Sequence, residues 1–133
     1  MRKNYLHKIT IIDFGTPKSE SIDDELKWIC ESFDLDPKKK ALAFEIFLYL
    51  LNASRKGKGV KTSEIIKDID VTQAAIVYHM NIFLCAGIAS KKGRVYYLRG
   101  KSLSETIYEI ELDMVRRMHA IRRIAEKIDE QLL

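Results

Sequence analysis

The chain has 133 residues, of which 47% are hydrophobic and 32% charged. This length fits one domain that can bury a core of its own, and the composition is typical of a globular protein. No apolar run approaches the ~18 residues that a membrane span requires. Residues 1–8 are too polar for a secretory signal. We therefore expect a cytoplasmic protein with no membrane partner.

The two cysteines, Cys30 and Cys85, lie far apart and form no C-x-x-C pair, which disfavours a disulfide scaffold and a thiolate metal site. We expect Cys30 to be a packing residue, and Cys85 a plain semi-buried thiol rather than a redox switch. No nucleophile–base pair, pair of catalytic carboxylates or glycine-rich phosphate loop can be recognised. We therefore expect neither an enzyme nor a bound metal or cofactor.

The formal net charge is only +4, but it is unevenly distributed. Residues 37–101 hold thirteen Lys/Arg against four Asp/Glu, whereas residues 1–36 hold five against eight and residues 102–133 hold five against seven. A basic middle between acidic ends suggests one surface that faces a polyanion. A solvated lysine-rich surface is the common alternative, and charge alone does not decide between the two.

Three segments are expected before the centre of the basic region. Residues 5–14 are rich in β-branched and aromatic types and predict a short strand or extended arm. Ser21 is expected to cap a helix at 22–34, whose apolar stripe must dock either on the core of this chain or on a partner. Asp36-Pro37 predicts the start of a helix to about Ala53, which is apolar on nearly every side and is therefore expected to be the central buried helix.

Two short helices with a tight connection follow. Thr62 or Ser63 is expected to begin the first, which runs to Ile69, and Thr72 to cap the second, which continues to about Ala86. This spacing is typical of a helix-turn-helix.

After Gly87 the hydrophobic period changes to two, so that residues 88–98 predict a β-hairpin with the basic tip Lys91-Lys92-Gly93. We therefore predict a mainly α protein with a small β-hairpin. Its parts are an arm at 1–20, a winged helix-turn-helix domain at 21–101 and a coiled-coil-like dimerisation helix at 102–133.

The last predicted helix carries apolar side chains at steps of three or four over residues 103–132. Four of them lie seven apart, as in one seam of a coiled coil, although companion positions such as Arg117 and Gln131 are less regular. The helix would span ~45 Å, so part of its stripe would be exposed to water in a monomer. We therefore predict a homodimer, with an interface formed by Ile22, Leu26, Ile29, Phe33, Ile107, Met114, Met118, Ile121, Ile128 and Leu132.

The helix predicted at 72–86 separates into two faces at ~100° per residue. Its inner face would hold Ile76, Met80 and Phe83. Its outer face offers amides that can read adenine edges, while Lys and Arg on the hairpin, including Arg99, can neutralise phosphates. The predicted DNA-binding residues are Thr72, Gln73, Ala74, Val77, Tyr78, His79, Asn81, Lys61, Lys91, Lys92 and Arg94.

Residues 71–88 (VTQAAIVYHMNIFLCAGI) and 93–98 (GRVYYL) resemble the recognition helix and wing of ArsR-like winged-helix regulators. In that family a run such as V-S-x-H-L-x-x-L-x-x-A-G-L precedes a wing of the form G-R-x-x-Y-x-L. The resemblance covers residues 41–100 and implies a homodimeric transcription regulator that pairs through its terminal helices. Ala74, Ala75 and Val77 replace the hydroxyl-bearing residues of the family, which predicts few hydrogen bonds to DNA bases. The resemblance gives no reason to expect a metal site in this chain.

The predicted function is that of a homodimeric, sequence-dependent double-stranded DNA-binding protein and transcription regulator, with helix 72–86 in the major groove and hairpin 88–98 on the backbone or minor groove. The alternative is a winged helix that serves as a protein-interaction module in a larger complex and does not bind DNA directly. The apolar recognition helix and the long C-terminal stripe favour this alternative. The sequence identifies no small-molecule effector.

Overall fold

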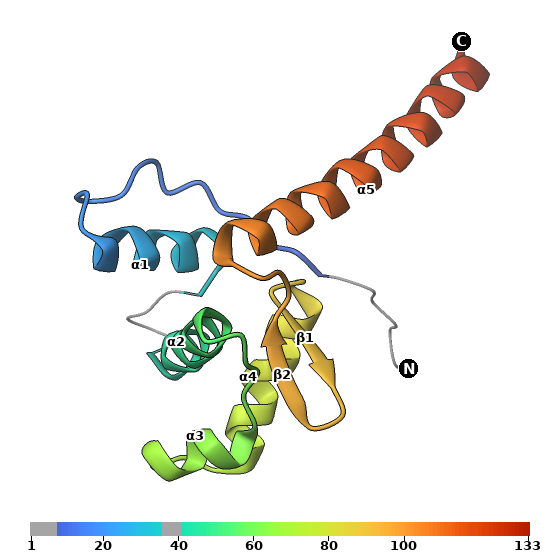
Figure 1. Cartoon of the computed structure of the whole chain (residues 1–133). Helices are drawn as coiled ribbons and strands as arrows, with labels where there is room; N and C mark the ends of the chain where they lie inside the picture. The colour runs from blue at the N-terminus through green and yellow to red at the C-terminus, as the bar shows by residue number, and fades with distance from the viewer. Residues whose placement is uncertain (1–7, 36–40) are drawn as a thin grey trace.

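A computed structural model describes residues 8–35 and 41–133 of the chain (Figure 1). This part of the chain is mainly helical, with one small antiparallel hairpin, and none of its helices has the length and hydropathy needed to cross a membrane. Its elements in chain order are α1 (Ile22–Ser32), α2 (Ala41–Arg55), α3 (Thr62–Asp68), α4 (Gln73–Cys85), β1 (Ala89–Lys92), β2 (Val95–Leu98) and α5 (Leu103–Leu132).

The helix starts that the sequence predicted are largely confirmed. Ser21 caps α1 by accepting a hydrogen bond from the Asp24 backbone N–H at 3.1 Å, and Thr72 caps α4 by accepting one from Ala75 at 3.1 Å. The helix predicted from Thr62 or Ser63 begins at Thr62. The start predicted at Asp36-Pro37 lies outside the described residues.

The N-terminal segment is an extended arm rather than a strand over its described part, residues 8–15. The backbone N–H of Lys8 donates to the carbonyl of Cys85 at 2.5 Å, and that of Ile12 donates to the carbonyl of Ser32 at 2.9 Å. Both acceptors lie at helix ends, where carbonyls have no partner within the helix, so the arm is held without a strand beside it. The arm thus runs from the end of α4 to α1 (Figure 1).

The core lies between α2 and α4, and α2 is the central helix that the sequence predicted. Ile46 and Leu50 of α2 are fully buried, as are Ile76 and Met80 of α4. Phe47 packs edge-on against Phe83, with ring centroids 6.4 Å apart.

The hairpin is turned by two residues alone. β1 and β2 pair from Ala89↔Leu98 to Lys92↔Val95, and Gly93 at the turn has a φ of +59°, the left-handed conformation that such a tight turn requires. The predicted tip Lys91-Lys92-Gly93 is therefore wrong, because Lys91 and Lys92 are strand residues. Successive strand side chains alternate, so these two lysines point to opposite faces of the hairpin.

A single β-bridge fixes the hairpin beside the segment that leads into α3. The N–H of Val60 donates to the carbonyl of Tyr96 at 2.7 Å, and the N–H of Tyr96 returns a bond to Val60 at 2.8 Å. Gly59 makes this approach possible, because a Cβ there would lie 2.8 Å from the Tyr96 carbonyl oxygen and against the side chains of Val95 and Tyr97.

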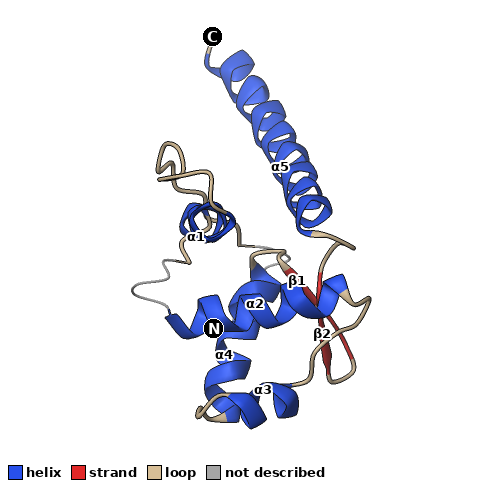
Figure 2. Cartoon of the chain, turned by 60° about the vertical axis from the view of Figure 1, so that its left-hand side comes forward, coloured by secondary structure: helices blue, strands red, loops and turns tan. Residues whose placement is uncertain are grey.

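Only the first half of α5 packs on the body of the protein. Thr106 and Ile110 are buried, whereas every residue from Val115 onward is exposed. Figure 2 shows this second half extending away from the cluster of α2, α3, α4 and the hairpin.

The steric role of Gly59 predicts the outcome of two alanine substitutions. Gly59→Ala must displace backbone and packed side chains, and should lower the free energy of unfolding by about 2–3 kcal/mol. Gly57→Ala meets no atom within 4 Å and only has to adopt a φ of +68°, so it should cost about 1 kcal/mol. Urea denaturation followed by circular dichroism measures both. Equal costs would contradict the close approach at Gly59.

Candidate functional site

The buried face of α4 determines which of its residues are exposed to solvent. Ile76, Met80 and Phe83 are fully buried, which fixes the rotation of the helix about its axis and leaves Tyr78 64% exposed. Thr72, Gln73, Ala74 and Asn81 are also exposed, and the orientation predicted from the helical period is confirmed.

A cleft of about 700 Å³ separates this face of α4 from the start of α3 and from the hairpin. We call it the basic cleft. Its side chains are cationic, amide, hydroxyl or apolar, and no carboxylate of the described residues lines it. The lining residues are Lys61, Thr62, Ser63, Ile66, Gln73, Val77, Lys91, Arg94 and Tyr96.

Two cations of the basic cleft are held by local geometry. The ammonium of Lys91 lies 5.2 Å from the centroid of the Tyr96 ring, which is within range of a cation–π contact. Lys61 stands at the N-terminus of α3, where its backbone N–H donates to the carboxylate of Glu64 at 3.3 Å. Lys61 therefore lines the cleft while its backbone N–H is bonded at the start of the helix.

The basic cleft brings together five of the predicted DNA-binding residues, namely Lys61, Gln73, Val77, Lys91 and Arg94. Sequence reasoning treated Thr62 and Ser63 only as helix-start residues and missed their place in the cleft. Their position directly after Lys61 was the available signal, because residues that follow an N-cap lie at the helix end.

Five other predicted residues, including His79, lie on α4 or at its start but outside the cleft lining, and so does Lys92 on the hairpin. Thr72, Ala74, Tyr78 and Asn81 are exposed on the surface of the helix. Lys92 lies on the opposite face of the hairpin, where it shares a second hollow with Lys58, Lys101 and the carboxylate Glu105.

His79 is half-buried rather than freely presented. Its ring packs edge-on against Tyr78, with centroids 5.2 Å apart. The edge-to-face arrangement is the favourable one for two aromatic rings.

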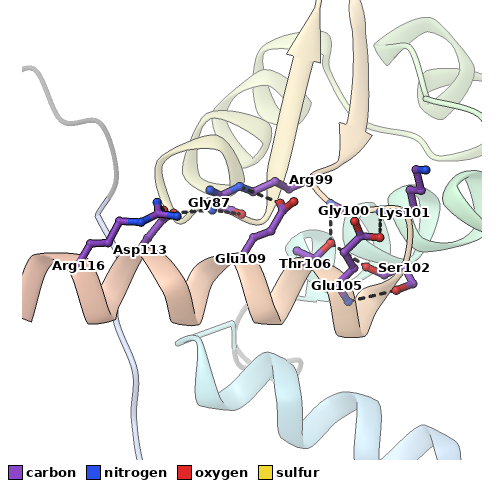
Figure 3. Close-up of polar contacts among 10 residues, drawn as sticks. All are labelled: Gly87, Arg99, Gly100, Lys101, Ser102, Glu105, Thr106, Glu109, Asp113 and Arg116. Carbon is purple, nitrogen blue, oxygen red and sulfur yellow. Dashed lines mark hydrogen bonds and ion pairs between the residues drawn. The ribbon is translucent and has the colours of Figure 1, made fainter.

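Arg99 was grouped with the phosphate-neutralising cations, and the structure corrects this prediction (Figure 3). Its guanidinium lies 2.6 Å from a carboxylate oxygen of Asp113 and 3.2 Å from one of Glu109, and its side chain is only 22% exposed. Arg116 contacts the other oxygen of Asp113 at 3.3 Å. Arg99 therefore fastens the end of the hairpin to α5 and is already neutralised within the chain.

The predicted dimer-interface residues divide into two groups. Leu26, Phe33, Ile107 and Met114 pack against the core of their own chain, and Ile29 is half-buried. The exposed members are Ile22 at 82%, Met118 at 60%, Ile121 at 52%, Ile128 at 49% and Leu132 at 80%.

The described residues contain no group of three or more His, Cys, Asp or Glu side chains that could hold a metal ion. No protein-family model, curated protein or solved structure matches this chain. The interpretation of the site therefore depends on its own geometry and charge.

The Arg99 ion pairs predict a stability effect that other hairpin cations lack. Arg99→Met leaves two partly buried carboxylates with fewer partners and should lower the free energy of unfolding by about 1–3 kcal/mol. The matched substitution Lys92→Met removes a solvated charge and should change it by less than about 0.5 kcal/mol. Urea denaturation measures both, and an unchanged stability for Arg99→Met would show that the ion pairs contribute nothing.

The two cysteines should react at very different rates. Cys30 is 1% exposed, and burial raises its pKa to about 12, so almost none of it is thiolate near neutral pH. Cys85 is exposed. A thiol reagent at pH 8 should modify one cysteine per native chain, none in Cys85→Ser, and two after unfolding in guanidinium.

Proposed function

We propose that this protein is a homodimeric winged-helix protein that binds double-stranded DNA and regulates transcription. The observation that carries the proposal is the basic cleft. Three cations and two hydroxyl side chains gather there beside an exposed helix face, and no carboxylate of the described residues opposes them. A surface of this kind favours a polyanion, because each phosphate gains a cation without meeting an acidic neighbour.

The exposed face of α4 suits the major groove of DNA. Ala74 and the half-buried Val77 are small, so the helix backbone can approach base edges closely. Gln73 and Asn81 supply amides that can pair with adenine, and apolar side chains can meet only a thymine methyl. With two reading side chains per subunit, sequence discrimination would be modest and would depend on pairing two half-sites.

The hairpin would bind the phosphate backbone on both sides. Lys91 and Arg94 face the basic cleft, while Lys92 faces the hollow that it shares with Lys58 and Lys101. A phosphate backbone on either side of the hairpin would therefore meet cations, with no acidic neighbour among the described residues of the basic cleft and beside Glu105 in the second hollow.

The exposed stripe on the second half of α5 supports a homodimer. Met118, Ile121 and Ile128 are each about half-exposed or more, and a second copy is the simplest cover for a row of apolar side chains on one helix. Two-fold symmetry would present two α4 helices to a pseudo-palindromic site with half-sites ~34 Å apart.

Charge reversal in the basic cleft tests the DNA-binding proposal. Lys91→Glu/Arg94→Glu should weaken binding to a fluorescent 30-base-pair duplex by about 100-fold, and should reduce the slope of log K against log salt by about two per subunit. Fluorescence anisotropy over a salt series measures both quantities.

The control carries the same change in net charge away from the cleft. Lys18→Glu/Lys27→Glu alters the exposed Lys18 in the loop before α1 and Lys27 of α1, which is partly buried and pairs with Asp23 at 2.8 Å. Circular dichroism checks that this variant is folded, and its affinity should change by less than about threefold. If the unaltered protein does not bind duplex at 50 mM salt, the DNA proposal fails. The protein-interaction alternative, favoured by the apolar outer face of α4, would then account for the same surface.

A further inference from the structure

The second half of α5, residues 115–133, leaves an ordered apolar stripe uncovered. We call it the projecting half, because it extends beyond the body of the protein (Figure 1). Ile110 in the docked half is 1% exposed, whereas Ile121 is 52% and Ile124 is 58% exposed. The stripe therefore continues from the core into solvent along one helix.

The spacing of the stripe keeps it on one face. Ile110, Ile121 and Leu132 lie eleven residues apart, a repeat of ~3.67 residues per turn that is close to the period of a straight helix. The stripe does not wind around the projecting half, so a single straight partner element can cover all of it.

The charges of α5 are arranged in three blocks along the helix. The first block, residues 103–113, holds four carboxylates and no cation. Residues 114–123 hold four arginines and no carboxylate, and residues 124–133 hold three carboxylates and one lysine. The projecting half therefore has a basic beginning and an acidic end.

These blocks discriminate between the two ways of pairing identical helices. In a parallel pair in register, the four arginines face the same four arginines of the partner. Arg117, Ile124 and Gln131 lie seven apart on one edge of the stripe, so Arg117 would also meet its own copy across the seam. An antiparallel pair instead places the basic block against the acidic block.

We propose that a second copy of α5 covers the projecting half in an antiparallel pair centred on Ile124. This proposal deepens the dimer part of the proposed function, since it names the partner segment and its direction. About that centre Arg117 lies opposite Gln131 of the partner subunit, next to the acidic end of the helix. Arginine can then pair with carboxylate in both halves of a symmetric contact.

The same geometry provides an occupant for an apolar groove beside α5. The groove has a volume of about 800 Å³, and its lining includes Ile11 of the arm, Phe33 of α1, and Met114, Val115 and Met118 of α5. In the antiparallel pair the last turns of the partner helix lie alongside these α5 residues, which brings its terminal leucines to the groove. The partner's terminal leucines would thus cover the apolar groove, and the groove would cover those leucines.

The antiparallel pair also sets the separation of the two bodies. Ile110, where α5 is docked, lies fourteen residues from Ile124, which corresponds to ~21 Å of helix. The two docked segments would then stand ~42 Å apart along the paired helices. This is of the same order as the ~34 Å that separates half-sites on one face of a duplex.

Disulfide formation between single cysteines tests the direction of pairing. The background is Cys85→Ser, which leaves only the buried Cys30, and circular dichroism checks that each variant is folded. Gln131→Cys alone should form less than about a tenth of cross-linked dimer, because the two positions are ~21 Å apart and a disulfide needs Cα atoms within ~7 Å. An equimolar mixture of tagged Arg117→Cys chains and untagged Gln131→Cys chains should cross-link mainly into mixed dimers.

Two outcomes would overturn the proposal. Efficient cross-linking of Gln131→Cys to itself would indicate a parallel pair, and would leave both the homodimer and DNA binding intact. A monomer by sedimentation at 50 µM chain, ~50-fold above a micromolar dissociation constant, would remove the pairing altogether. Loss of duplex binding with mixed dimers still formed would instead refute the proposed function and leave the antiparallel pair standing.

Discussion

The docking of one face of α4 into the core is the constraint on which the rest of the structure depends. Ile76, Met80 and Phe83 have no exposed surface, so the helix cannot rotate without creating a cavity. The bridge between Val60 and Tyr96 then fixes the hairpin beside the segment that leads into α3. Cations such as Lys61 and Lys91 repel one another and would not gather unaided. The buried scaffold holds them together, which is what a preorganised binding surface requires.

Basic and acidic segments adjoin at the junction of the hairpin and α5, and the fold pairs part of their charge there. Arg99 takes up Glu109 and Asp113, the carboxylates of the first charge block that lie nearest the hairpin. These carboxylates are thereby neutralised locally, and neither of them lines the basic cleft. The arginine that sequence reasoning assigned to a polyanion thus serves an ion-pair contact between the hairpin and α5.

Local signals in the sequence predicted most elements, because their causes are local. The caps at Ser21 and Thr72 and the stripe of α5 are short-range patterns, and all are observed. The role of Arg99 depends on which helix packs behind the hairpin, and no short-range pattern encodes that. The opposite directions of Lys91 and Lys92 follow from strand alternation, and an exact placement of the turn would have revealed them. The arm was predicted as a possible strand because its composition suits one, but the carbonyls that hold it belong to helix ends.

The joint between the hairpin and α5 decides whether pairing of the helices can position the two clefts. From that joint the helix extends ~45 Å, so a swing of only 10° would move its far end by ~8 Å. The Gly100 N–H donates to the Thr106 hydroxyl at 2.8 Å, and a Cβ on Gly100 would come within 2.7 Å of the Thr106 nitrogen. Thr106 is buried and its hydroxyl also donates to the Ser102 carbonyl at 2.9 Å. The close packing and the hydrogen bonds at this joint restrict the swing of α5. The arrangement of two paired α5 helices would therefore determine how the two basic clefts are placed relative to a duplex.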